Sequence, residues 1–166
     1  MKIRIVLAIG LILFFSQLAA REYDLSTVVS GVVNQVNVKV GEKVKKGQLL
    51  LLLEQNVFES EFAEAEKMLL SAQLHRDEAK KELERSEELY ERTVLSDHEL
   101  NVSKAEFARM DALLAVAESQ KQKAAYALKY SKIVAPVAGK VQKISAWPGM
   151  VVNNRVSTTI LLTIKD

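Results

Sequence analysis

Cysteine is absent from the 166-residue chain, proline occurs only twice, glycine six times, and neither charge sign dominates. The absence of cysteine excludes a disulfide scaffold, a thiolate zinc site, a redox Cys-x-x-Cys motif and a lipid-modified N-terminal cysteine. A net charge of +2 is far from the strongly basic character typical of nucleic-acid binding. The only histidines, His75 and His98, provide little material for a metal site or acid–base chemistry. We therefore expect no enzyme, no cofactor, no metal and no nucleic-acid partner.

The first twenty residues have the pattern of an export signal. Lys2 and Arg4 precede an apolar run over 5–15, and small residues close the segment at Ala20. This order is typical of a secretory signal peptide, and the run is shorter than the ~20 residues that a membrane-spanning helix needs. Two outcomes stay open, cleavage after Ala20 or retention as an N-terminal anchor, and the remainder is exported in both.

The middle of the chain is predicted to form two long helices. Neither glycine nor proline occurs between Gln48 and Ala135, which excludes a series of tight turns. Strong helix formers dominate 57–92 and 97–132. The intervening residues 93–95 allow only a tight reversal, so the two helices must run antiparallel. Each has about 36 residues, which predicts a hairpin roughly 50 Å long.

Cap signals and heptad spacing support the two helices. Ser96 and Glu99 fit a capping box, and Asn56 with Glu59 is interpreted as the N-cap of the first helix. Eight of ten heptad positions over 58–90, and seven of ten over 100–131, are apolar or aromatic. The second helix also has a row of small residues that would let another helix approach closely: Ala105, Ala108, Ala112 and Ala115.

The two flanks repeat each other. A shift of 108 residues places Gly31 on Gly139 and Gly41 on Gly149, each followed by similar apolar alternation. One such flank is too small to be stable alone, so the two are predicted to pack as a β-sandwich with the hairpin inserted between them. The alternation Val36, Val38, Val40 is predicted to place these three side chains on the inward face.

These flanks resemble the two halves of a lipoyl/biotinyl-type domain. The first half, 26–54, contains Ser30-Gly31-Val32-Val33, and the second, 133–164, contains Ala135-Pro136-Val137-Ala138-Gly139. A lipoyl domain split by a hairpin behind a secretory signal is similar to the periplasmic adaptors, also called membrane fusion proteins (HlyD-like). The resemblance implies an α+β fold, namely a split lipoyl/biotinyl-like β-sandwich with an inserted antiparallel two-helix coiled-coil hairpin over 56–132, its tip at about 92–96.

The resemblance also implies a function. Such an adaptor is a non-enzymatic subunit of a tripartite efflux or secretion system in the periplasm, associated with the inner membrane. Its partners are a TolC-like outer-membrane channel, an inner-membrane exporter of the RND or ABC type, and further copies of itself. Family members that dock onto such channels have Arg, three residues, Leu, six residues and Ser at the tip, which corresponds here to Arg85, Leu89 and Ser96.

Alternatives remain for the tip and for the whole chain. Ser96 is also explained as an N-cap, Leu89 as part of the seam, and Arg85 as a solvated charge.

The β-barrel and membrane-proximal domains usual in the family have no counterpart in this sequence, which leaves the contact with the pump open. A lipoyl- or biotin-type carrier and a structural envelope coiled-coil protein are the competing functions. The carrier is disfavoured because the hairpin occupies the junction where carriers hold their modified lysine.

Overall fold

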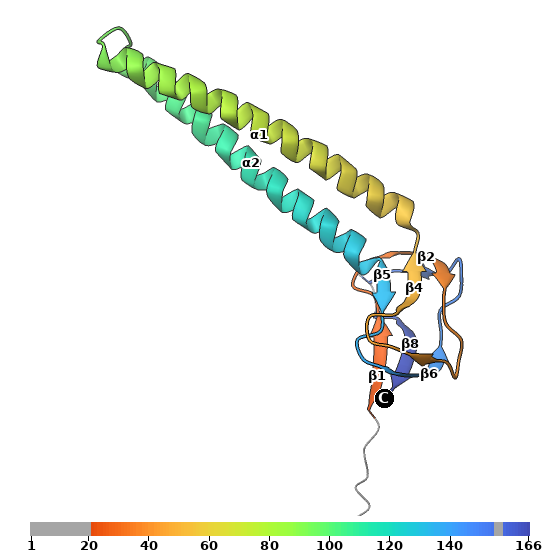
Figure 1. Cartoon of the computed structure of the whole chain (residues 1–166). Coiled ribbons are helices and arrows are strands. Elements are labelled where there is room, and N and C mark those ends of the chain that lie inside the picture. Colours follow the sequence, from red (N-terminus) through yellow and green to blue (C-terminus); the bar gives the residue numbers. More distant parts are fainter. Residues whose placement is uncertain (1–20, 155–157) are drawn as a thin grey trace, which may run out of the picture.

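Two parts make up the computed structural model, which describes residues 21–154 and 158–166. A long hairpin of two helices, residues 55–130, projects from a β module formed by residues 21–54, 131–154 and 158–166 (Figure 1). The predicted export signal lies outside the described residues. In the part of the chain that is described, no helix is both long and apolar enough to cross a membrane.

The β module consists of two four-stranded sheets that each combine strands from both flanks. One sheet has the order β1-β8-β6-β3 and the other β5-β4-β2-β7. The strands are β1 Glu22–Ser26, β2 Gly31–Val36, β3 Lys43–Val44, β4 Leu49–Leu53, β5 Lys132–Val134, β6 Gly139–Ile144, β7 Val151–Val152 and β8 Ile160–Lys165. The first flank therefore contributes β3 to the sheet that contains β6 and β8, and the second flank contributes β7 to the sheet that contains β2 and β4. Neither flank can complete a sheet alone.

The structure confirms the internal repeat. Strands β2 and β6 have the same alternation of exposed and buried residues, and so do β3 and β7. Gly41 and Gly149, the equivalent turn residues, both have a φ of 88°. Because side chains other than glycine rarely adopt this backbone conformation, each repeat reverses direction at the same place for the same reason.

Aliphatic side chains from both flanks fill the core between the sheets. Leu51 and Leu53 of β4 pack with Leu161 in one cluster, while Leu50 packs with Leu162 in a second. All five are fully buried. β4 and β8 are interior strands of their sheets, which agrees with their almost uninterrupted apolar sequences.

The prediction for Val40 was wrong. Val38 is buried, whereas 64% of Val40 is exposed. Strand β2 ends at Val36, and the chain then turns at Gly41, where the Glu42 amide donates to the Lys39 carbonyl oxygen. The two-residue alternation of a strand does not continue through such a turn, so Val40 faces outward.

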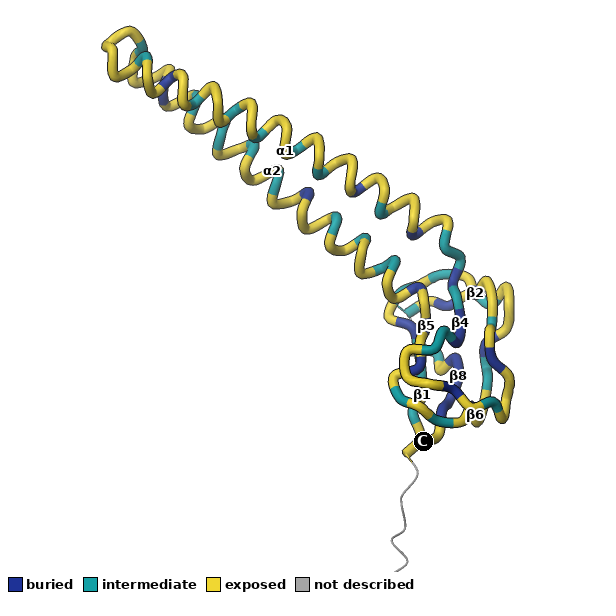
Figure 2. Tube along the Cα trace, viewed as in Figure 1, coloured by how far each residue is buried: buried dark blue, intermediate teal, exposed yellow. Residues whose placement is uncertain are grey.

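The hairpin follows the predicted seam. Helix α1 spans Gln55–Glu91 and α2 spans Asp97–Tyr130. Of the twenty heptad positions, nineteen are buried or half-buried, and Tyr90 is the exception with 41% of its surface exposed. The remaining helix surface is largely exposed along its whole length (Figure 2). The hairpin is therefore a two-helix rod whose only interior is the narrow line between the helices.

Each polar residue in the seam has a partner. The Arg76 Nε lies 3.3 Å from the Asp111 Oδ1 of the other helix, and its guanidinium lies over the Phe107 ring. The Lys121 Nζ lies 2.9 Å from the Glu66 Oε1 and over the Phe62 ring. The Ser86 and Ser103 hydroxyls are 2.8 Å apart. Since each pair joins a particular residue of α1 to one of α2, these contacts specify the register of the hairpin.

The hairpin base is fixed to the β module by a buried hydroxyl. Ser131, which ends the seam, is fully buried and donates to the Leu128 carbonyl oxygen at 2.7 Å. The Gln55 side-chain amide donates to the Ser131 hydroxyl at 2.8 Å and to the Leu53 carbonyl oxygen at 3.1 Å. The first residue of α1 thus binds both the strand before it and the end of α2.

The N-cap predicted for α1 was wrong. The helix begins at Gln55, its N-cap is Glu54, and no side chain caps it. Asn56 lies inside the first turn and donates from its Nδ2 to the Glu54 Oε1 at 3.0 Å. Strand β4 continues almost directly into the helix, which leaves Asn56 two positions too late to act as the cap.

Candidate docking site at the hairpin tip

The hairpin reverses direction within a short ordered turn. Thr93 has a φ of 60°, and no other described residue except glycine has a positive φ. The Thr93 amide donates to the Tyr90 carbonyl oxygen at 2.9 Å, and the Val94 amide donates to the Leu89 carbonyl oxygen at 3.0 Å. Left-handed backbone at a residue other than glycine is costly and persists only when its surroundings impose it. The tip therefore has a defined shape.

A complete capping box opens the return helix, as predicted. The Ser96 hydroxyl accepts from the Glu99 amide at 3.3 Å, and the Ser96 amide donates to the Glu99 Oε2 at 3.0 Å. The Ser96 hydroxyl also donates to that carboxylate at 2.7 Å. Hydrogen bonds from the Ser96 side chain and, second, from its backbone hold the pKa of Glu99 below its usual value. Because its carboxylate form is stabilised, Glu99 fixes the start of α2.

The three predicted docking residues lie at the same end of the hairpin. Arg85 is highly exposed, with 69% of its side chain accessible, and its Nη1 donates to the Glu82 Oε2 at 2.9 Å. Leu89, one turn further along α1, is half-buried, and Ser96 is exposed at the start of α2. The contact with Glu82 uses one of the five N–H donors of the Arg85 guanidinium, so the others remain for a partner.

Sequence reasoning missed two features of the tip. The Tyr90 hydroxyl donates to the Asp97 Oδ1 at 2.6 Å and so links the two helices across the turn. This hydrogen bond raises the pKa of Tyr90. Val94 is 70% exposed at the apex. The exposure of Val94 could have been predicted from its position in the chain reversal, where a side chain cannot pack between the helices. Tyr90 gave no such signal, because it fits the heptad pattern of the seam.

Candidate metal ligands do not cluster in the part of the chain that the structure describes. Residues 21–154 and 158–166 contain no group of three or more acidic, histidine or cysteine side chains that could hold a metal ion. The tip presents a cation, exposed aliphatic surface and a hydroxyl on an ordered turn.

The split sandwich with its inserted hairpin defines a class of protein, the membrane fusion proteins. Residues 21–164 match the family described as RND MFP, barrel-sandwich hybrid domain. The chain belongs to this family of HlyD-like periplasmic adaptors, which are not enzymes, and both the resemblance and the fold class inferred from the sequence are confirmed.

Two relatives of known name are similar to this chain in sequence. The chain is 30% identical to the macrolide export protein MacA of Escherichia coli O157:H7, over 89% of this chain and 44% of MacA. It is 28% identical to the multidrug resistance protein MdtA of Pectobacterium atrosepticum, over 74% of this chain and 30% of MdtA. The chain thus spans less than half the length of these relatives.

A solved structure has the same arrangement. A MacA–MexA chimeric protein, which contains the Pseudomonas aeruginosa MexA α-hairpin domain, aligns with a TM-score of 0.63 and 25% identity. The match covers 88% of this chain and 46% of the chimera. Efflux adaptors are therefore the group that this chain resembles in both sequence and structure.

Proposed function

We propose that this protein is the periplasmic adaptor of a tripartite efflux system and connects an inner-membrane exporter, of the RND or ABC type, to a TolC-like outer-membrane channel. The observation that supports this most directly is the shape of the molecule, a rod of two helices with an ordered tip on a β module (Figure 1). The relatives named for macrolide export and multidrug resistance support an efflux role. The N-terminal segment would deliver the chain to the periplasm and to the inner membrane.

The tip is proposed to contact the channel through Arg85, Leu89 and Ser96. Arg85 presents a planar donor fork that suits carboxylates and the carbonyl groups at helix ends. Leu89 lies one turn from Arg85 on the same side of α1 and adds apolar surface. Ser96 is held by its capping box at the neighbouring end of α2. The ordered turn reduces the conformational entropy lost on docking.

We also propose that the protein works as a homo-oligomer. The small residues predicted to admit another helix, Ala105, Ala108, Ala112 and Ala115, are all exposed on α2. They therefore remain available to a neighbouring copy. Sedimentation analysis of the purified protein tests this point, and a monomer at every accessible concentration would contradict it.

Charge reversal at Arg85 tests the docking site. Arg85→Asp should abolish crosslinking between the tip and the channel and should abolish export, while helix content stays unchanged. A surface substitution of this kind usually changes stability by no more than about 0.5 kcal/mol. The matched control is Lys81→Asp, one turn earlier on the same helix. Equal losses in both variants would mean general electrostatics and would contradict a specific tip site.

A further inference from the structure

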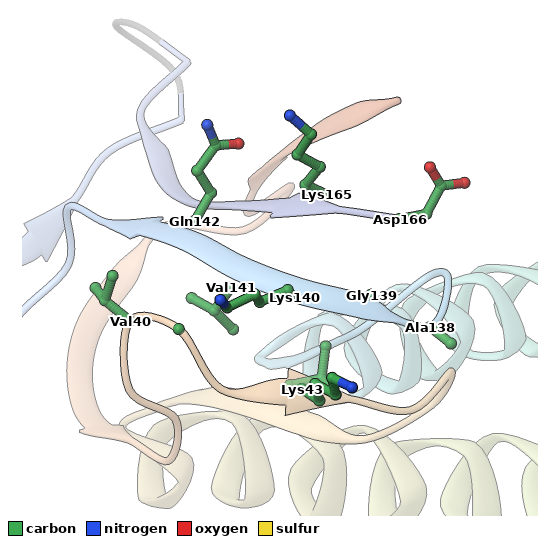
Figure 3. Close-up of a pocket in the computed structure, with 11 residues that line it drawn as sticks. Val40, Lys43, Ala138, Gly139, Lys140, Val141, Gln142, Lys165 and Asp166 are labelled. Carbon is green, nitrogen blue, oxygen red and sulfur yellow. The ribbon is translucent and has the colours of Figure 1, made fainter. Parts of the chain in front are cut away.

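A groove lies at the end of the β module that contains the described C-terminus, away from the hairpin. It has a volume of about 780 Å³, and strands β3, β6 and β8 contribute to its lining. Figure 3 shows three lysines around it, Lys43, Lys140 and Lys165, one from each of these strands. Val40, whose exposure the sequence did not predict, lines the same groove.

The three lysines form one row across the sheet. Lys43 is the register partner of Lys140, and Lys140 is the register partner of Lys165. Like charges directly opposite each other on neighbouring strands are destabilising. The row ends at Glu22 of β1, which is opposite Lys165. Within the described residues no salt bridge reaches any of the three lysines, so the fold leaves this repulsion largely uncompensated.

Basic and acidic residues are unevenly distributed along the molecule, and the groove lies in its basic part. Among the described residues the β module contains nine Lys and Arg residues against five Asp and Glu, whereas the hairpin contains eleven against sixteen. All seven salt bridges among the described residues lie on the hairpin. The lysines of the β module are therefore available for an anionic partner.

The position of Arg21 indicates which anionic partner faces the groove. The Arg21 amide donates to the Asp166 Oδ1 at 3.0 Å, and the Asp166 amide donates to the Arg21 carbonyl oxygen at 3.2 Å. Asp166 lines the groove. Arg21, the first described residue, therefore lies at the edge of the groove, and the apolar run 5–15, with Lys2 and Arg4 before it, precedes Arg21 in the sequence. A segment of that composition partitions to a membrane.

We infer that this end of the β module binds the anionic surface of a phospholipid bilayer, with the lysine row against the headgroup phosphates and Val40 against the acyl boundary. Fixed lysines attract anionic lipid at short range, and exposed aliphatic side chains add affinity where they enter the interface. Membrane contact at this end would direct the hairpin away from the bilayer. The inference does not depend on docking at the tip, so failure of either proposal leaves the other standing.

Vesicle binding tests the inference. The protein is purified with the N-terminus that it has in cells, whether cleaved or not. Its affinity is then measured for vesicles of phosphatidylcholine alone and of phosphatidylcholine with added phosphatidylglycerol. We expect tighter binding to the anionic vesicles, weakened by salt. Lys43→Gln, Lys140→Gln and Lys165→Gln together should weaken binding to the anionic vesicles by about a hundredfold. Binding to neutral vesicles should not change, because any contribution of the apolar run is common to both proteins.

The control removes the same number of charges from the hairpin. Lys67, Lys104 and Lys123 are exposed and form none of the seven salt bridges, so changing all three to Gln should alter vesicle binding less than about threefold. Equal losses in the two triple variants would overturn the inference, as would equal binding of the wild type to both vesicles. Preference for soluble polyglutamate or duplex DNA over anionic vesicles would identify a different class of partner and would also overturn it. Thermal unfolding verifies that both variants remain folded.

Discussion

The hairpin and the β module are stabilised in different ways. In the hairpin only five residues are buried, and the ion pairs of the described chain are concentrated there. In the β module fully buried leucines from both flanks form the core. The strand pairs of the module join distant residues, as Glu22 with Lys165, whereas the helices are joined by a turn of a few residues. The hairpin extends the reach of the molecule, and the β module supplies its stable base.

Deleting the hairpin gives the largest test of this difference. Joining Glu54 to Ile133 by a short linker should remove the helical circular dichroism signal and leave a folded β module with dispersed NMR resonances. Both sheets are formed without the helices. We expect a lower melting temperature than in the whole protein, because Phe58 of α1 packs in the core with Leu53. A product without dispersed resonances would show that the module depends on the hairpin to fold.

Truncating one leucine in each part should lower the free energy of unfolding by unequal amounts. Leu51→Ala removes a fully buried side chain from the β module and should lower the free energy of unfolding by about 2–5 kcal/mol. Leu114→Ala in the hairpin seam should cost about 1 kcal/mol, since Leu114 is only half-buried. Urea denaturation measures both values. A loss at Leu114 as large as that at Leu51 would contradict the contrast between the two parts.

The two repeats of the β module should respond differently at equivalent glycines. A β-carbon at Gly139 would lie 2.5 Å from the Lys165 carbonyl oxygen, so Gly139→Ala should cost about 1–3 kcal/mol of stability. At Gly31 the nearest atoms belong to the side chains of Leu53 and Phe58, at 3.3 and 3.4 Å. Because side chains can move more easily than a paired strand, Gly31→Ala should cost less. Melting temperatures of the two variants compare them directly, and the reverse order would be inconsistent with this packing.

The smallest effect concerns acid pH at the tip. Glu99 has a folded pKa below its usual 4.5 because it accepts hydrogen bonds from Ser96. The capping contribution is therefore complete above about pH 4.5 and is lost as the pH falls through the folded pKa of Glu99. Carbon chemical shifts of residues 97–100 should show fraying of α2 over this range.

A matched variant isolates that titration. Glu99→Gln cannot change charge, so its first turn should show no acid-dependent fraying beyond that of other helix ends. Identical pH profiles in the wild type and in this variant would show that another group controls the tip. Helical signals from the seam near Ala117 provide an internal reference, since that residue is buried far from the tip.

Much of the candidate site follows from the sequence. The capping box at Ser96 and Glu99 was predictable because both residues act within one turn, and the structure confirms it. The motif of the resembling family singled out Arg85, Leu89 and Ser96, and the predicted chain reversal placed them at one end of the hairpin. The Tyr90 contact with Asp97 was not predictable, because it depends on how the two helices meet at the turn.

What the sequence by itself determined is the set of local features: helix formers without glycine or proline, heptad spacing, a cap, and two repeats that share turn glycines. The cap and the turn glycines depend on residues within a few positions of one another, and the heptads and the repeat are patterns of spacing that the sequence itself displays. The tertiary structure alone decided the exchange of β3 and β7 between sheets, the partners of the polar seam residues and the row of Lys43, Lys140 and Lys165. These features join residues that are far apart in the sequence, such as Lys43 and Lys140, and only the packing of the whole chain sets their register.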